Sequence, residues 1–229
     1  MKRCLLCSRP LQIPVSLGFL LSFKPYRRAE VCQNCQNQFQ KIDRHRCCRY
    51  CGRAGQFPDR ICRDCRLWQR TATADFRNRG LYRYNSAMSD YMKHYKFNGD
   101  YRLRRAFQPE FNQQARASRR LVVPIPVHPS TYRRRGFNQV RGLLGDVPMV
   151  NVLVTRNSRK HRPQSSKDRP SRLRMPQPFK MVEGGRQKIM NQNVLVVDDV
   201  YTTGTTIRHA ARLLKFNGAK SVTGLTLAR

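Results

Sequence analysis

Acidic residues are scarce in this chain. Only 13 Asp and Glu stand against 46 Lys and Arg, so the formal net charge is +33 at pH 7. Solubility asks a small domain for a net charge of only about 2–8 in magnitude, and repulsion among like charges costs folding stability. The imbalance argues against cationic partners and predicts a polyanionic one, with nucleic acid as the first candidate. The alternative is a like-charged surface kept for solubility.

Long apolar segments are also missing. The run from Leu11 to Phe23 has 13 residues and is interrupted by Pro14 and Gly18, whereas a membrane-spanning helix needs about 20 apolar residues. The basic segment that follows lacks the small-residue cleavage site of a secretory signal. We therefore expect no transmembrane segment and a cytoplasmic protein.

Cysteine is absent from residues 66–229, because all nine cysteines lie between Cys4 and Cys65. A C-x2-C turn aims two thiolates at one point, and two such turns complete the closed tetrahedral shell of a structural zinc ion. The spacing therefore predicts two zinc ions. Eight cysteines form four such pairs, namely Cys4 with Cys7, Cys32 with Cys35, Cys48 with Cys51, and Cys62 with Cys65.

The pairing of these turns is left open by their spacing. Sequential pairing and an interleaved cross-brace both satisfy it, and Cys47 is left over as a bystander. The competing interpretation is thioredoxin-like redox chemistry, which needs one C-x2-C at a strand-to-helix turn rather than four in a basic segment. The basic residues among the second and third pairs either touch phosphates or are solvated loop charges; they are Lys41, Arg44, Arg46, Arg49 and Arg53.

Element signals begin after Trp68. Continuous β-branched runs at 121–127, 193–197 and 221–228 suit doubly buried parallel strands, and an amphipathic helix between the last two makes a βαβ unit. Residues 69–229 are thus predicted to form an α/β domain with a mainly parallel sheet, preceded by a zinc-binding, ribbon-like module over residues 1–68. The helix before Gly218 is expected to bury Ile207, Ala210, Ala211, Leu213, Leu214 and Phe216, and an earlier helix Met88, Met92, Tyr95 and Phe97.

Two of the few acids, Asp198 and Asp199, stand side by side after the buried strand 194–197. Parallel sheets bind ligands at the carboxyl ends of their strands, and backbone N–H groups at a helix N-terminus hold anions. Two carboxylates would repel a bare phosphate, but they suit vicinal sugar hydroxyls or a hydrated Mg²⁺. A ribose 5-phosphate satisfies both halves. Its phosphate would lie on Thr202, Thr203, Gly204, Thr205 and Thr206.

The pattern from Val194 to Thr206 resembles the binding motif of type I phosphoribosyltransferases. That resemblance implies a site for phosphoribosyl pyrophosphate with Mg²⁺. Together with the four cysteine pairs and the blocks "VPIPVHPSTYRRRGFNQ" and "QSSKDRPSRL", the chain is similar to the ComF family of competence proteins, in particular its ComFC type. This second resemblance implies a role in natural transformation, with single-stranded DNA and a ComFA-like helicase as partners and contact with the inner membrane face through the uptake machinery.

Two functions remain in competition. One is a DNA-handling protein with a phosphoribosyl or phosphate pocket, and the other is an active phosphoribosyltransferase, for which no base-reading segment is evident. The cations expected to contact nucleic acid, or to cover pyrophosphate in a transferase, are Arg133, Arg134, Arg135, Lys160, Lys167 and Arg169. Tyr132, beside the arginine triplet, is the candidate for stacking on a base.

Overall fold

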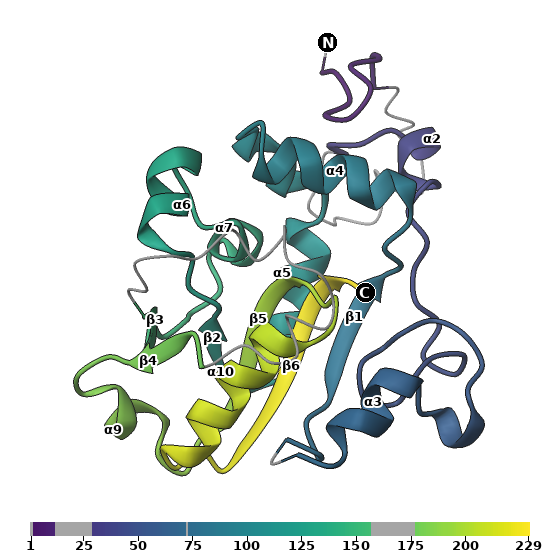
Figure 1. Cartoon of the computed structure of the whole chain (residues 1–229). Coiled ribbons are helices and arrows are strands. Elements are labelled where there is room, and N and C mark those ends of the chain that lie inside the picture. Colours follow the sequence, from purple (N-terminus) through teal and green to yellow (C-terminus); the bar gives the residue numbers. More distant parts are fainter. Residues whose placement is uncertain (1, 12–28, 72, 157–176) are drawn as a thin grey trace, which may run out of the picture.

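The computed structural model describes residues 2–11, 29–71, 73–156 and 177–229, and a parallel sheet forms its centre (Figure 1). The strand order is β1-β6-β5-β2, and all three neighbouring pairs are parallel. The predicted α/β class with a mainly parallel sheet is therefore confirmed. Its strands are β1 (Asn78–Tyr82), β2 (Leu121–Pro124), β5 (Asn193–Val200) and β6 (Ser221–Ala228).

The sheet separates two hydrophobic clusters, because alternate residues of β5 point to opposite faces. Val194 and Val196 pack against α10 (Thr205–Phe216). Leu195 and Val197 pack on the other face, in a cluster that contains side chains from three helices. These helices are α4 (Ser86–Lys96), α5 (Gln108–Ala117) and α7 (Gln139–Leu144).

The helix α10 connects β5 to β6, as the βαβ prediction required. Its buried side chains include Ile207, Ala210 and Leu214, which follow a spacing of three and four residues. The prediction was wrong for Phe216, which is 88% exposed, since nine residues after Ile207 a helix has turned half a revolution away from its buried side. Phe97 after α4 is likewise 60% exposed, while Tyr95 is fully buried.

Smaller elements flank the sheet. The strands β3 (Leu153–Thr155) and β4 (Phe179–Met181) form an antiparallel pair. Between β2 and α7 lies α6, and η2 precedes α5. The bounds of these short helices are η2 (Tyr101–Ala106), α6 (Pro129–Arg135) and α9 (Gly185–Ile189).

The cysteine-rich segment packs along the edge strand β1 (Figure 1). The Ile42 amide donates to the Leu81 carbonyl at 2.9 Å, and the Asn78 amide donates to the Tyr50 carbonyl at 2.6 Å. The boundary near residue 68 stays a prediction, but the second half of the segment clearly shares the core of the sheet. Its short helices are α2 (Gln33–Gln36), η1 (Pro58–Arg60) and α3 (Arg63–Trp68). In the described part of the chain, no helix combines the length and apolar character that crossing a bilayer requires.

Candidate functional site

The two adjacent aspartates lie near the carboxyl end of β5, where this strand still pairs with β6. We expected the strand to end at residue 197, but β5 continues to Val200, and Asp198 is in register with Thr226 of β6. Both carboxylates are buried, with Asp198 8% and Asp199 5% exposed. Because the segment is extended, the two side chains leave the strand toward opposite faces. They therefore have separate environments.

Asp199 forms an ion pair with a lysine from the neighbouring helix α4. Lys96 Nζ lies 2.8 Å from Asp199 Oδ2, and both side chains are largely withdrawn from solvent. A buried carboxylate needs such a partner, because an unpaired charge in a low-dielectric interior is costly. Arg135, at the end of α6, also interacts with this carboxylate. Burial lowers the pKa of Arg135, and the Asp199 charge partly opposes that effect. The structure thus gathers cations from α4 and α6 around Asp199.

Within the described residues, Asp198 forms no ion pair of its own, although the Lys96 charge also acts to lower its pKa. Burial, and next the neighbouring Asp199 carboxylate, raise the pKa of Asp198 to about 8. Its Oδ1 atom accepts a hydrogen bond from the Asp199 amide at 2.9 Å.

We expect Asp198→Asn to stabilise the protein near neutral pH. An amide keeps the acceptor for the Asp199 amide, and it removes a group whose folded pKa of about 8 lies above the unfolded value of roughly 4. The raised pKa means that the wild type loses stability as pH rises from about 4 to about 8, whereas the variant does not titrate there. The free energy of unfolding should increase by more than about 1 kcal/mol at pH 8 and change little at pH 4. Urea unfolding at both pH values measures this, and an equal effect at both would contradict the raised pKa.

The loop after β5 is built from small residues that turn into α10. Thr203 Oγ1 and Thr205 Oγ1 are 2.9 Å apart, and the Thr205 amide donates to Thr203 Oγ1 at 3.4 Å. Both side chains are buried, whereas Thr202 is exposed and Thr206 half-buried. All five predicted residues, Thr202 to Thr206, therefore lie together at the N-terminus of α10, and we call this segment the phosphate loop after the ligand that the sequence predicts for it.

The carbonyl groups of this turn are fixed by two side chains from other parts of the chain. Arg229 Nη1 donates to the Thr202 carbonyl at 2.8 Å and to the Tyr201 carbonyl at 3.3 Å, and Trp68 Nε1 donates to the Thr203 carbonyl at 3.0 Å. In a trans peptide the N–H of the next residue points opposite to the carbonyl. The amides of Thr203 and Gly204 consequently point away from Arg229 and Trp68, and neither has an acceptor among the described residues.

Gly204 allows the turn to close. Its φ is +83°, and a Cβ atom there would lie 2.1 Å from Tyr201 Oη. Tyr201 is itself fixed in place, because Arg208 Nε donates to its hydroxyl at 3.0 Å. Arg208 is 2% exposed, contacts the faces of Trp68 and Phe76, and donates to the Thr73 carbonyl at 2.6 Å. The loop therefore rests on a rigid, buried support.

A cavity of about 440 Å³ opens beside the phosphate loop. Thr202 and Thr203 line it from one side, and Arg53 and Arg83 bring positive charge to it. Asp64 and Arg229 line the cavity as well, so it lies on the Arg229 side of the loop. Asp198 and Asp199 are buried and do not line it.

The structure places the predicted basic residues in different environments. Arg133 and Arg134 on α6 are exposed, and Tyr132 beside them is 51% exposed. Arg135 is half-buried, bonds to Gln139 and faces Asp199, so it belongs to the interior of the site. The other three predicted residues, Lys160, Lys167 and Arg169, lie outside the described residues.

The eight paired cysteines form two groups of four, and the pairing is sequential. Within each group the sulfur atoms lie within 4.8 Å of one another. The thiolates also accept backbone hydrogen bonds, such as Cys32 N to Cys4 Sγ at 3.3 Å and Cys62 N to Cys48 Sγ at 3.4 Å. Four thiolates at this separation fit a tetrahedral metal ion. The groups are Cys4, Cys7, Cys32 and Cys35, and Cys48, Cys51, Cys62 and Cys65; Cys47 belongs to neither.

The second cysteine group contacts the support of the phosphate loop. Arg229 Nε lies 3.4 Å from Cys51 Sγ, while the same guanidinium holds the loop carbonyls and pairs with Asp64 at 3.6 Å. Trp68 ends α3, the helix that carries Cys65. The second cysteine group, Arg229, Trp68 and the loop therefore form one connected unit.

Four residues that matter at this site were not found by sequence reasoning. Lys96, Arg208 and Arg229 are three among 46 basic residues, so nothing local distinguishes them. Trp68 carried a signal, because it is the single tryptophan of the chain and directly follows the cysteine pairs.

Comparison with known proteins agrees with this geometry. The family model described as "Phosphoribosyl transferase domain" matches residues 103–229, which include the phosphate loop. The chain therefore belongs to the phosphoribosyltransferase domain family, and its full-length relatives place it in the ComFC type of the ComF family.

The curated relatives cover almost the whole chain. Competence protein ComFC of Streptococcus pneumoniae is 32% identical over 228 residues, covering 99% of this chain and 100% of that protein. Competence protein ComFC of Bacillus subtilis is 34% identical over 237 residues, covering 99% and 94%. Competence protein F of Haemophilus influenzae is 26% identical over 219 residues, covering 87% and 90%.

Proposed function

We propose that this protein acts in natural transformation, where it binds incoming single-stranded DNA in the cytoplasm and holds a phosphorylated ribose on its phosphate loop. The relatives named competence proteins support the biological role, and the net charge of +33 supports a nucleic-acid partner. Contact with a ComFA-like helicase at the inner membrane face is part of the same proposal, and the family membership supports it.

The observation that carries the phosphate site is the anchoring of the loop carbonyls. With Arg229 and Trp68 holding those carbonyls, the amides of Thr203 and Gly204 are directed to the other side, at the N-terminus of α10. Oriented amides at the positive end of a helix dipole bind phosphate without rearrangement. The amides of Thr203 and Gly204 therefore form the bottom of the proposed 5′-phosphate site.

The two aspartates would supply the ribose-binding part of the site. Asp199 would accept a hydrogen bond from a ribose hydroxyl and share its carboxylate with Lys96. Asp198 is the second carboxylate of this part of the site. A hydrated Mg²⁺ would be held by these carboxylates together with the phosphate oxygens of the ligand.

The two cysteine groups would each hold one structural zinc ion. Four thiolates and no open position match a structural site rather than a catalytic one. The exposed residues Arg133, Arg134 and Tyr132 of α6 would contact DNA phosphates and bases near the loop. Arg135 is assigned instead to the buried surroundings of Asp199.

The competing function is an active transferase. The cations gathered at Asp199 and the family membership favour it, since transferase chemistry needs positive charge near the departing pyrophosphate. The two functions differ in turnover. A transferase releases pyrophosphate from phosphoribosyl pyrophosphate when a base is supplied, whereas the proposed binding protein does not.

Two titrations test the proposal. Calorimetry with phosphoribosyl pyrophosphate and Mg²⁺ should show binding that Asp199→Asn weakens by about tenfold or more, as expected for a lost hydrogen bond to a charged group. Fluorescence anisotropy with labelled oligothymidine should show binding whose salt slope is unchanged in this variant. Asp146→Asn is the matched control, because Asp146 is an exposed acid that pairs with Arg116 far along the chain from the loop. Pyrophosphate release with any base would favour the transferase instead, and absence of both binding events would refute the proposal.

A further inference from the structure

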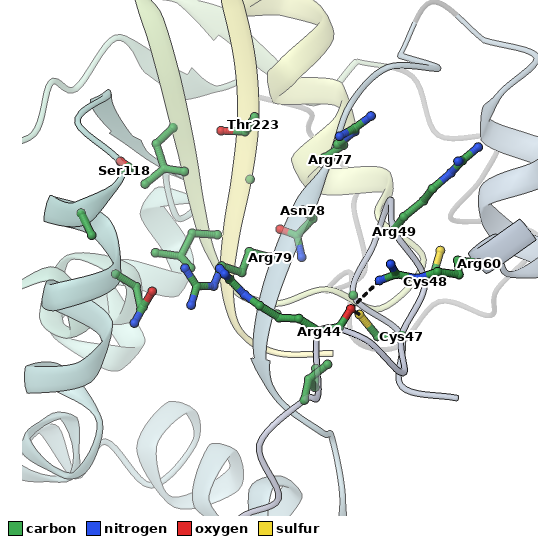
Figure 2. A pocket seen from close by; sticks show the side chains of 18 residues that line it. Arg44, Cys47, Cys48, Arg49, Arg60, Arg77, Asn78, Arg79, Ser118 and Thr223 are labelled. Carbon is green, nitrogen blue, oxygen red and sulfur yellow. Dashed lines mark hydrogen bonds between the residues drawn. The ribbon is translucent and has the colours of Figure 1, made fainter. Parts of the chain in front are cut away.

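A second hollow, of about 500 Å³, lies between the second cysteine group, β1 and the end of α5 (Figure 2). No Asp or Glu is among the residues that line it. Its lining shares no residue with the cavity beside the phosphate loop. We call it the arginine groove, after the five arginines that line it: Arg44, Arg49, Arg60, Arg77 and Arg79.

The protein compensates these guanidinium groups in part, since the Glu110 carboxylate acts to raise the pKa of Arg79 and Cys48, a member of the second cysteine group, also lines the groove. Among the described residues, none of the five forms an ion pair with a carboxylate, and nearby acids are engaged elsewhere, with Asp59 pairing to Arg66 at 3.6 Å and Glu110 to Lys41 at 2.9 Å. Burial, and next the like charge of Arg44, lower the pKa of Arg79. Like charges gathered in this way destabilise the fold, and a bound anion would offset the repulsion.

The groove has two walls, one formed by the cysteine-rich segment with Arg44, Arg49 and Arg60, and the other by β1 and the residue before it with Arg77 and Arg79. Backbone hydrogen bonds fix the first wall. The Arg49 amide donates to the Arg60 carbonyl at 2.9 Å, and the Arg60 guanidinium donates to the Arg44 carbonyl. The turn at Gly52 lies against β1 so closely that a Cβ atom on Gly52 would come within 3.0 Å of the Gly80 amide. The cationic surface is therefore formed before any ligand arrives, which lowers the entropy cost of binding.

An aromatic ring stands between two of the arginines. The guanidinium carbon of Arg49 lies 5.3 Å from the centroid of the Tyr50 ring, and that of Arg77 lies 6.0 Å from it. Tyr50 does not line the groove, because it packs against the core cluster that contains the second cysteine group. Its ring instead supports the side chains of Arg49 and Arg77 at the edge of the groove. A positively charged groove that follows the backbone is a common way for proteins to bind single strands without reading their sequence.

We propose that the arginine groove binds the phosphodiester backbone of single-stranded nucleic acid. This inference rests on the proposed function, because it names the surface that holds the strand. A single strand fits a hollow whose cations come from two walls, whereas a duplex is usually contacted by a helix or ribbon that projects into its groove. The groove would thus work beside the phosphate loop and independently of it.

The test compares two charge-matched double variants of the full-length, zinc-loaded protein. Arg44→Gln with Arg77→Gln removes one exposed cation from each wall and leaves the Arg44 carbonyl in place for Arg60. Arg186→Gln with Arg212→Gln removes two exposed cations from α9 and α10, outside the groove. Binding of labelled oligothymidine is measured by anisotropy from 0.05 to about 0.3 M salt.

The groove variant should bind about 25-fold more weakly at 0.1 M salt, with a salt slope smaller by about 1.4, because each lost single-strand contact contributes roughly 0.7 to the slope. The control variant should change little. If both variants lost the same affinity, the groove would not be the binding surface. The wild-type protein would still bind single strands, so the proposed function would stand. A wild type that fails to bind oligothymidine would instead refute the proposed function itself. A groove variant weakened only toward duplex DNA would show that the occupant is wrongly assigned.

Discussion

Cys51→Ser is expected to lower zinc content from two ions to one per chain and to weaken phosphoribosyl binding at the same time. Removing even an indirect, outer partner of a metal costs about 10–100-fold in metal affinity, so losing one of four direct thiolates should cost more. Cys51 Sγ also lies 3.4 Å from Arg229 Nε, and Arg229 holds the carbonyls of Tyr201 and Thr202. Zinc analysis by native mass spectrometry and calorimetry with phosphoribosyl pyrophosphate measure the two effects.

Two cysteine variants separate this link from general destabilisation. Cys47→Ser changes a buried cysteine that belongs to neither group, so both zinc ions and ligand affinity should persist. Cys7→Ser should release the other ion with little effect on the phosphate loop, because Cys7 belongs to the first group. A Cys51→Ser protein that keeps two ions, or loses one and binds the sugar phosphate unchanged, would contradict the proposed connection.

Gly204→Ala should abolish most binding at the phosphate loop. The added Cβ atom would lie 2.1 Å from Tyr201 Oη, and Tyr201 cannot withdraw because it is buried and bonded to Arg208. The loop must therefore shift and carry the Thr203 and Gly204 amides with it. Hydrogen bonds to charged groups contribute about 1.5–3 kcal/mol each, so losing one or two lowers affinity by about 100-fold. Calorimetry with phosphoribosyl pyrophosphate measures the loss.

Gly184→Ala is the matched control for this variant. Gly184 has a φ of +67°, close to the +83° of Gly204, but an added Cβ atom there meets nothing within 4 Å. Both variants therefore carry the strain of an alanine at positive φ, which costs on the order of 1 kcal/mol of stability. Only Gly204→Ala should lose ligand affinity. Equal ligand affinities in the two variants would show that the position of the loop is unimportant for binding.

The chemistry-bearing residues could be predicted from sequence because each belongs to a local pattern. The four C-x2-C turns predicted two groups of four cysteines, which the structure contains. The run from Val194 to Thr206 predicted a strand followed by a tight turn and a helix, which the structure also contains, while its ligand stays a prediction. The strand 221–228 was also predicted with its observed bounds. Local patterns of this kind depend on chain geometry that operates over one turn or one strand.

The supporting residues could not be predicted, because their roles depend on contacts between distant parts of the chain. Trp68 and Thr203 are 135 residues apart, and Arg229 and Cys51 are 178 apart. Phe216 was misplaced for a related reason, since apolar character was taken as burial without its angular position on α10. Sequential pairing of the cysteines likewise became visible only when both turns of each group were located in space.

The central claim is that the turn from Thr202 to Thr206 holds the phosphate of a phosphorylated ribose. Diffraction from crystals soaked with phosphoribosyl pyrophosphate and Mg²⁺ tests it most directly. The expected result is a 5′-phosphate within about 3 Å of the Thr203 and Gly204 amides, with the ribose hydroxyls toward Asp199. Sugar phosphate bound only among the arginines of the groove, with the loop amides making no contact to it, would contradict the claim.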